Sequence, residues 1–172
     1  AAGWLVVTHD GGDSWQPLAD PAAMRYCDPK LFAESNPKDL WLLCGGVPAT
    51  IMQGKELFVS TDGGKTWSLR SDAMPPGEGR LDNLPLVGHV SDLAVTSSKV
   101  AFIGLGRSTL YTTSDGGKSW APSIPFDVAA AGDVGVEVVR FLDEKHGWAL
   151  SGPNVVYRTE DGGVTWQAVT LP

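Results

Sequence analysis

The chain has 172 residues, 42% of them hydrophobic, and 13 basic against 20 acidic side chains give it a net charge of −7. This length is sufficient for one domain with a real core. The acidic balance and the lack of a basic cluster exclude a surface built for nucleic acid or an anionic membrane. No hydrophobic run approaches the roughly 20 residues that span a bilayer, so we expect no membrane insertion. Since residue 1 is alanine, we expect a processed or excised chain.

An octet of similar sequence occurs four times, with its aspartates at positions 10, 62, 115 and 161, which are 52, 53 and 46 residues apart. Such a period is typical of one supersecondary unit per repeat. The aspartate can accept main-chain N–H groups and a following glycine can take a positive φ, so the octet predicts a tight hairpin turn. A tryptophan five residues after each aspartate is expected to begin the returning strand and to pack against the next unit. The octet residues with this structural role are Asp10, Gly12, Trp15, Asp62, Gly64, Trp67, Asp115, Gly117, Trp120, Asp161, Gly163 and Trp166.

Short strands separated by turn residues account for the rest of the chain. The first repeat shows only an outer hairpin, at residues 4–8 and 14–17. The second predicts four strands at 26–32, 39–44, 57–60 and 66–70, and the third predicts four at 90–95, 100–105, 110–113 and 119–122. The fourth predicts strands at 136–141, 147–151, 155–159 and 165–169. Hydrophobic residues at helical spacing are nearly absent, so the chain is predicted to be all-β.

The octets resemble the Asp box, or BNR repeat, of sialidases, sortilin-type receptors, xyloglucanases and the photosystem II assembly-factor family. The element from Phe141 to Ala149, which contains Gly-Trp-Ala, is most similar to the assembly-factor type. The resemblance implies a β-propeller of four-stranded antiparallel blades, with each box at the outer rim and away from the ligand site.

The repeats predict about three and a half blades in a single segment: a half blade at 1–18 and blades at about 26–70, 88–122 and 135–170. Such an array leaves apolar faces at its ends and does not close a ring of 4 to 8 blades by itself. We therefore expect a partial propeller, completed by a missing half or, as the alternative, by an oligomer partner.

The two cysteines are predicted to lie close together. If the strands at 26–32 and 39–44 pair around the intervening turn, Cys27 lies opposite Cys44. A disulfide there would stabilise the fold by roughly 3 kcal/mol through its effect on the unfolded chain, and two neighbouring reduced thiols are the alternative. An oxidised pair would favour an extracellular or periplasmic location, as the resemblance also implies.

Long connections on the face opposite the box turns are the expected ligand-binding loops. They span residues 16–25, 45–56, 71–88 and 121–135. For each polar residue in them, a simple solvated loop position is the alternative reading. The candidate ligand-binding residues are Arg25, Tyr26, Arg80, Asp82, Asn83, His89 and Asp127.

The sequence favours a non-catalytic binding or scaffold module with a protein or carbohydrate ligand. The Phe-Arg-Ile-Pro sequence of many sialidases is missing, and no spacing selects a pair of carboxylates for hydrolysis. The three histidines are scattered and no phosphate loop occurs, so neither a metal nor a cofactor is expected. Two alternatives stay open: a fragment of a sialidase-like or xyloglucanase-like glycoside hydrolase, and a receptor-type propeller that binds a peptide.

Overall fold

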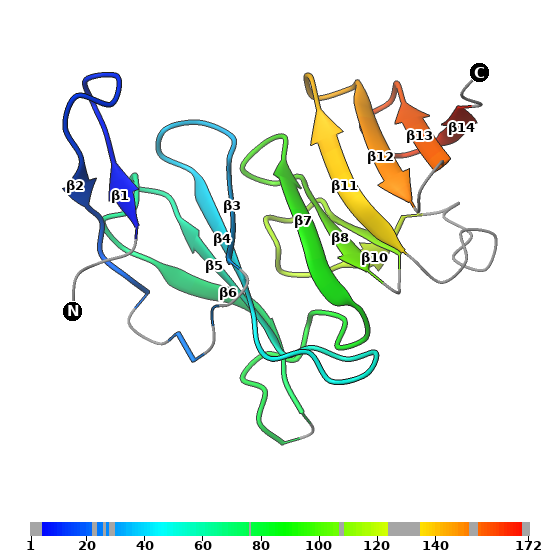
Figure 1. Ribbon diagram of the computed structural model, residues 1–172, viewed down its shortest axis with the longest axis horizontal. Coiled ribbons are helices and arrows are strands. Elements are labelled where there is room, and N and C mark those ends of the chain that lie inside the picture. The colour runs from blue at the N-terminus through cyan, green and yellow to red at the C-terminus, as the bar shows by residue number, and fades with distance from the viewer. Residues whose placement is uncertain are drawn as a thin grey trace.

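The computed structural model describes residues 5–21, 24–25, 27, 30–75, 77–106, 109–123, 135–151 and 155–169. The regular structure in these residues consists of β-strands, which form one two-stranded and three four-stranded antiparallel sheets (Figure 1). The predicted all-β fold with about three and a half blades is therefore confirmed. None of the described residues belongs to a helix that is long and apolar enough to cross a membrane.

Each sheet is a meander in which strands adjacent in sequence are adjacent in space. The first sheet contains β1 (Val6–Val7) and β2 (Gln16–Pro17). The second contains β3 (Lys30–Glu34), β4 (Leu40–Gly45), β5 (Lys55–Ser60) and β6 (Ser68–Ala73). The third contains β7 (His89–Val95), β8 (Ala101–Gly106), β9 (Leu110–Thr113) and β10 (Ala121–Pro122). The fourth contains β11 (Val136–Phe141), β12 (Gly147–Ser151), β13 (Val155–Thr159) and β14 (Gln167–Val169).

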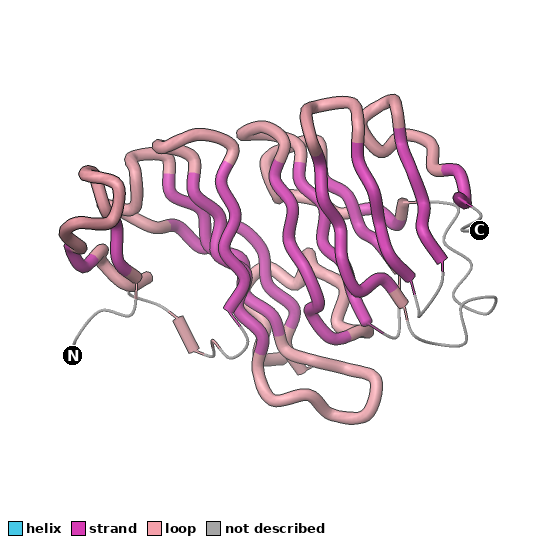
Figure 2. Tube along the Cα trace, turned by 45° about the horizontal axis from the view of Figure 1, so that its top comes forward, coloured by secondary structure: helices cyan, strands magenta, loops and turns pink. Residues whose placement is uncertain are grey.

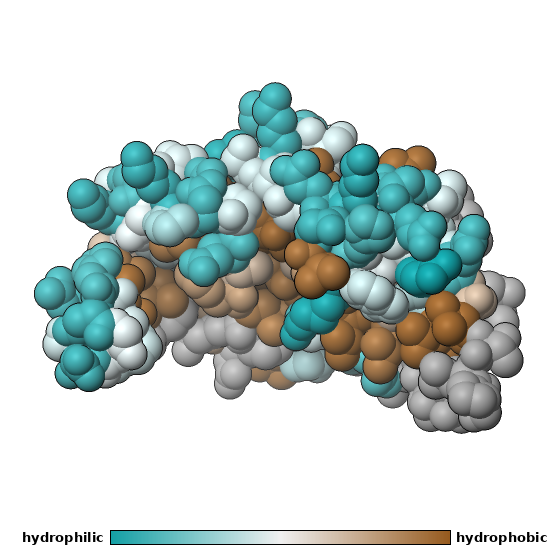
Figure 3. Space-filling model, turned by 90° about the horizontal axis from the view of Figure 1, so that it is seen from above, coloured by the Kyte–Doolittle hydropathy of each residue, from teal (hydrophilic) through white to brown (hydrophobic). Residues whose placement is uncertain are grey.

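The sheets stand side by side like the blades of a propeller, with the inner strands β3, β7 and β11 next to one another (Figure 1). The box turns lie at one end of the blades, and the long loops after β4 and β6 lie at the other (Figure 2). Seen from the box-turn end, hydrophilic residues cover much of the surface and hydrophobic residues gather along one side (Figure 3). The box turns and the loops are thus separated by the length of a blade.

The exposure of residues in equivalent strands shows whether one or both faces of a sheet are covered by neighbouring sheets. All six residues of β4 are buried, because this strand has a neighbouring sheet on both of its faces. The equivalent strand β12 alternates between buried and exposed residues, as expected for a sheet with only one covered face. The second face of the fourth sheet is therefore not covered by the described residues.

Two hydrophobic clusters hold adjacent four-stranded sheets together. One joins the second and third sheets through residues such as Trp41, Leu57 and Ile103. The other joins the third and fourth sheets, where Phe102 stacks on Phe141 with ring centroids 4.5 Å apart and also contacts Trp166. Burial of this aromatic and aliphatic surface is the main force that stacks the blades.

The box tryptophans connect neighbouring blades, although they lie just before the outer strands rather than within them as predicted. Trp120 Nε1 donates a hydrogen bond of 3.1 Å to Ser71 Oγ on the preceding blade, and the Ser71 hydroxyl donates to the Gly117 carbonyl. At the next junction, Trp166 Nε1 donates to Ser123 Oγ at 3.1 Å. One serine hydroxyl at each of these junctions thus satisfies the indole of the following blade.

The junction between the hairpin and the second sheet lacks this serine. Leu18 has the equivalent position, since its N–H donates to the Leu5 carbonyl as the Ser123 N–H donates to the Leu110 carbonyl. Trp67 Nε1 is buried without a hydrogen-bond partner in the described part of the chain. This junction relies on apolar contacts, in which Leu5 and Trp67 pack beside Leu42, Cys44 and Phe58.

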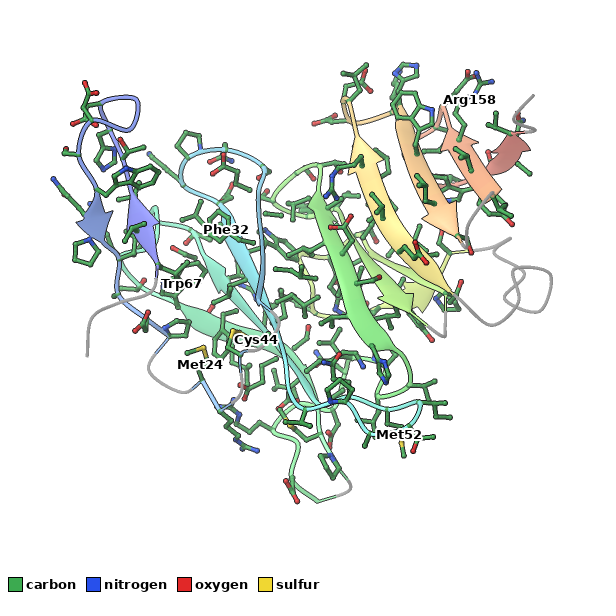
Figure 4. The ribbon with its side chains drawn as sticks, viewed as in Figure 1. Met24, Phe32, Cys44, Met52, Trp67 and Arg158 are labelled. Atoms are coloured by element: carbon green, nitrogen blue, oxygen red, sulfur yellow. A yellow bond between two sulfur atoms is a disulfide. The ribbon has the colours of Figure 1, made fainter. Side chains whose placement is uncertain are left out.

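Cys27 and Cys44 form a disulfide. The predicted register that led to this pairing is wrong, because Cys44 faces Lys30 and not Cys27. The strand begins at Lys30, directly after a proline in the sequence, which has no N–H for the sheet. Cys27 reaches Cys44 from the segment that precedes β3, where the Met24 sulfur also lies 3.7 Å from Cys44 Sγ (Figure 4).

Candidate functional site

The loop end of the second sheet carries an assembly of two long loops, residues 46–54 after β4 and residues 74–75 and 77–88 after β6. Met52 forms isolated bridges with Ala49 in its own loop and with Val87 in the other. The Gly88 N–H donates to the Ile51 carbonyl at 2.7 Å. Backbone pairing of this kind joins the two loops into one surface, which we call the loop platform.

Two buried polar side chains support the loop platform from below. Lys55 is 1% exposed, and its Nζ donates to the carbonyls of Gln53, Pro85 and Leu86 at 2.9, 2.9 and 3.0 Å. Burial lowers the pKa of Lys55 to about 7. Three carbonyl acceptors match the three hydrogens of an ammonium group, so the side chain is positioned by its own protein.

Gln53 completes this support. Its side chain donates to the Gly46 carbonyl at 2.8 Å and accepts the Val90 N–H at 2.7 Å. A Cβ at Gly45 would lie 2.6 Å from the Gln53 amide nitrogen, so only glycine fits beside it. The glutamine side chain therefore ties the loop after β4 to the inner strand β7.

A second network fixes the segment 78–84 and centres on two buried carboxylates at the ends of β5 and β6. Asp72 accepts the N–H groups of Arg80, Leu81 and Asp82 at 2.7–2.8 Å. Burial opposes its ionisation, but these three N–H donors and the Arg80 charge outweigh that effect and lower the pKa of Asp72. Asp72 thus acts as the anchor of a turn.

Glu56 joins this network to the segment before β3. It forms an ion pair with Arg80 and accepts the Arg25 N–H at 2.8 Å. The Arg25 guanidinium donates to the Glu78 carbonyl at 2.6 Å. Glu56 and Asp72 are both 0% exposed, so their carboxylates are used inside the protein.

Exposed apolar side chains cover the loop platform. Val47 is 88% exposed, and Ile51, Met52 and Val87 are 47%, 44% and 43% exposed. A cavity of about 210 Å³ opens beside them, lined by Gly46, Val47, Gly54, Met74 and Pro75. Met52 lies at the loop end of the molecule, below β7 in Figure 4. Exposed hydrophobic residues that cluster on a rigid base are a feature of interaction surfaces.

The structure brings four of the predicted ligand-binding residues into the second network. Arg25 and Arg80 both bind Glu56. Asp82 has a positive φ of 49°, and its carboxylate lies over Gly79. Asn83 accepts the Asp72 N–H and donates to the Lys118 carbonyl of the next blade at 2.8 Å. The side chains of Arg25, Arg80 and Asn83 therefore hold the loop in place.

The remaining candidates are separate from that network. His89 begins β7, and its Nε2 is buried without a partner among the described residues. Tyr26 and Asp127 lie outside the described residues. Sequence reasoning missed the roles of Glu56, Asp72 and the exposed Met52. The available signal was a carboxylate close to the end of each of two predicted strands: Glu56 directly precedes the strand at 57–60, and Asp72 lies two residues after the strand at 66–70.

At the opposite end, all four boxes form the same hydrogen-bond network. In the second box, the Ser60 hydroxyl donates to Asp62 Oδ1 at 2.8 Å and accepts the Gly64 N–H at 2.8 Å. The Thr66 hydroxyl and the Thr66 N–H donate to the Asp62 carboxylate at 2.7 and 2.9 Å. These bonds, with the Thr66 hydroxyl first, lower the pKa of Asp62 to about 2.

The other three boxes repeat these contacts, and hydrogen bonds lower the pKa of their aspartates as well. The second glycine of each box has a positive φ between 82° and 104°. Each carboxylate is used by its own turn. In the described part of the chain, no group of three or more His, Cys, Asp or Glu residues is arranged to hold a metal ion.

The blades and their rim turns define the class of protein as an Asp-box β-propeller. The BNR/Asp-box repeat profile matches residues 58–69. The profile of the family "Photosynthesis system II assembly factor YCF48" matches residues 78–172, which is more than half of the chain. The chain belongs to that family. No curated protein matches the sequence at a significant level.

Solved structures show the same fold. A YCF48 bound to D1 peptide is 24% identical with a TM-score of 0.56 and covers 81% of this chain and 40% of its own. YCF48 from Cyanidioschyzon merolae is 16% identical with a TM-score of 0.58, covering 95% and 52%. The GH74 xyloglucanase from Xanthomonas campestris is 20% identical with a TM-score of 0.60, covering 83% and 23%. The chain thus spans about half or less of the length of these structures.

Proposed function

We propose that this chain provides a protein-binding surface, that the loop platform is the contact surface, and that the ligand is an extended peptide with apolar side chains. The observation that carries the proposal is the exposure of Val47, Ile51, Met52 and Val87 on loops fixed by buried Lys55 and Gln53. A rigid apolar surface binds with little loss of its own conformational entropy.

A peptide fits this surface better than a carbohydrate does. The two loops contain no aromatic residue, although sugar rings are commonly bound by stacking on aromatic side chains. Hydrolysis is also less well supported, because Glu56 and Asp72 are buried and bonded to Arg80 and to backbone N–H groups. A YCF48 relative has been solved with D1 peptide, which supplies a defined probe.

The test is the binding of fluorescein-labelled D1 peptide to the intact chain, followed by fluorescence anisotropy. The double variant Val47→Glu/Met52→Glu places two charges on the loop platform and is expected to weaken binding about tenfold or more. Leu142→Glu is the matched control, since Leu142 is 77% exposed in the turn after β11 at the box end. Absence of binding, or equal loss in both variants, would overturn the proposal.

A further inference from the structure

A cavity of about 220 Å³ opens between the second and third sheets at the box end of the molecule. Strands β4, β5 and β6 contribute one wall, and the other comes from the third box and from the turn between β7 and β8. Each of these two sheets also packs against residues on its other face, so the described residues complete this junction. The cavity and the loop platform lie at opposite ends of the blades (Figure 2).

Three cationic side chains line this cavity: Arg70 of β6, Lys99 of the turn between β7 and β8, and Lys118 of the third box. Their charged groups have no hydrogen bond or ion pair with another described residue. Arg70 is partly buried and lies over the box turn, since a Cβ at Gly117 would be 3.1 Å from its Cγ and a Cβ at Gly116 would be 3.9 Å from its Nη1. Packing thus positions the arginine while its donors stay unused within the described chain.

A buried neutral donor belongs to the same lining. Trp41 is 0% exposed, and its Nε1 is buried without a hydrogen-bond partner among the described residues. An indole N–H can only donate, and it usually has an acceptor when it is buried. The indoles of Trp120 and Trp166 have such acceptors in Ser71 and Ser123. An acceptor atom on a ligand would satisfy Trp41 in the same way.

The junction between the third and fourth sheets lacks most of this donor set. Equivalent positions are defined by shared contacts: the ring that packs on the second box glycine, the residue before the serine that binds a box indole, and the residue three places after the box aspartate. At these positions the next junction has Phe102 for Trp41, Pro122 for Arg70 and Val164 for Lys118. Blades therefore stack without these donors, and stacking does not explain their presence.

Two carboxylates also line the cavity, and both have partners within the protein. Asp115 accepts the hydroxyls of Ser119 and Thr113 and the Ser119 N–H in its own box turn. Asp39 accepts the Asn36 side-chain amide at 2.6 Å. The cavity therefore combines three unpaired cations with carboxylates that are already hydrogen-bonded, in a chain that is acidic overall.

We propose that this junction cavity binds a small tetrahedral oxyanion of the phosphate class, with the three cations and the Trp41 indole as its donors. A guanidinium can bind two phosphate oxygens at once, and an ammonium group binds phosphate as a point charge. The volume of about 220 Å³ is below the roughly 300 Å³ at which pockets for larger ligands begin. The site does not depend on the function proposed for the loop platform.

The test is titration of the intact chain with sodium phosphate, with sodium chloride added to keep the ionic strength constant so that charge screening does not change. Nitrogen-15 NMR observes the indole signals, and the Trp41 signal is assigned by its absence in Trp41→Phe. That signal is expected to shift with phosphate, whereas the signal of Trp166 at the next junction is expected to stay in place. An unchanged Trp41 signal at saturating phosphate would overturn the proposal.

Calorimetry of two charge variants measures the contribution of the cations. Arg70→Gln removes the guanidinium, and Lys118→Val introduces the residue that the fourth box has at this position. Each is expected to weaken phosphate binding about tenfold or more. Lys65→Val is the matched control, because Lys65 has the same position in the second box but does not line the cavity, and it is expected to bind like the wild type. Thermal unfolding verifies that each variant is folded, and equal loss in all three would contradict the site.

Comparison of ligands tests the class of anion. Three cations favour a dianion over a monoanion, so phosphate is expected to bind more tightly than acetate. Glycerol 3-phosphate presents the same type of oxygens as inorganic phosphate, and the tighter of the two shows whether a phosphate ester or the free ion is the preferred source. Acetate binding as tight as that of phosphate would overturn the assignment of a phosphate-class ligand.

Discussion

The rim turns and the loop platform both use aspartate carboxylates to bind backbone N–H groups, but they do so at different ranges. Asp62 receives its hydrogen bonds from Ser60 and Thr66, which lie within four residues of it. Asp72 binds residues eight to ten positions further along the chain. The rim arrangement occurs four times, each time with local partners, whereas the loop arrangement occurs around one carboxylate that is fully buried.

This difference distinguishes an element that every blade repeats from one that occurs at a single place. A turn closed by local bonds can be repeated in every blade without regard to the rest of the fold, so it serves the propeller as a whole. The network around Asp72, Glu56 and Arg80 shapes one place only, next to the exposed side chains of the loop platform. Loops that are held by a unique network on a repeated scaffold are where binding specificity is usually found.

If the buried loop network contributes more to stability than an exposed rim position, the largest loss of stability is expected on substitution of Asp72. Asp72→Ala leaves three N–H groups in the loop without their acceptor, and we expect the free energy of unfolding to fall by about 3 kcal/mol. Chemical denaturation measures the loss, and hydrogen exchange should show faster exchange of the Arg80, Leu81 and Asp82 amides. Asp13→Ala, in an exposed box position without a hydrogen bond in the described structure, is the matched control and should change stability by less than about 0.5 kcal/mol. Equal effects at both positions would contradict the distinction.

An intermediate effect is expected at the blade junctions. Ser123→Ala removes the acceptor of the Trp166 indole, which is 4% exposed, and should lower the free energy of unfolding by about 1–2 kcal/mol. Ser71→Ala should have a similar effect through Trp120. Thermal denaturation of the two variants tests whether the junctions are equivalent. A stability unchanged in both would show that the indole hydrogen bonds do not hold the blades together.

The smallest change in stability per residue is expected from protonation of the box aspartates. The pKa values of Asp62 and Asp161 are about 2 in the folded chain, below the usual value of 3.8. Because the folded state lowers these pKa values, their stabilising contribution is present above about pH 4 and is lost as the pH falls towards 2.

Thermal midpoints measured between pH 5 and pH 2 test this prediction. The double variant Asp62→Asn/Asp161→Asn cannot ionise at these two positions, so its midpoint should fall less steeply with acid than that of the wild type. The other carboxylates with lowered pKa values, such as Asp115 and Asp72, retain part of the dependence in both proteins. Identical slopes would mean that the two box carboxylates do not contribute to acid sensitivity.

Sequence reasoning selected the two loops of the candidate site, but it did not predict what their residues bind within the protein. Arg80 and Asn83 were selected as polar residues in a long loop, and the structure shows both side chains bonded to their own protein. Their contact with a ligand stays a prediction. The apolar residues Val47 and Met52 were not among the predicted site residues. The sequence does not indicate whether a hydrophobic residue in a loop is exposed to solvent, as both of these are.

The sequence by itself determined the parts of this protein whose bonds are local: the four box turns, the strand that follows each hydroxyl-aspartate pair, and hence the propeller class. Tertiary structure alone decided the register that separates Cys27 from the strand position opposite Cys44. It also decided the capture of Lys55 by carbonyls 30 and 31 residues away. The physical reason is the separation in sequence between hydrogen-bond partners. A box turn is closed by residues within four positions of its aspartate, whereas the partners of a buried charge come from loops that are placed near it only when the blades stack.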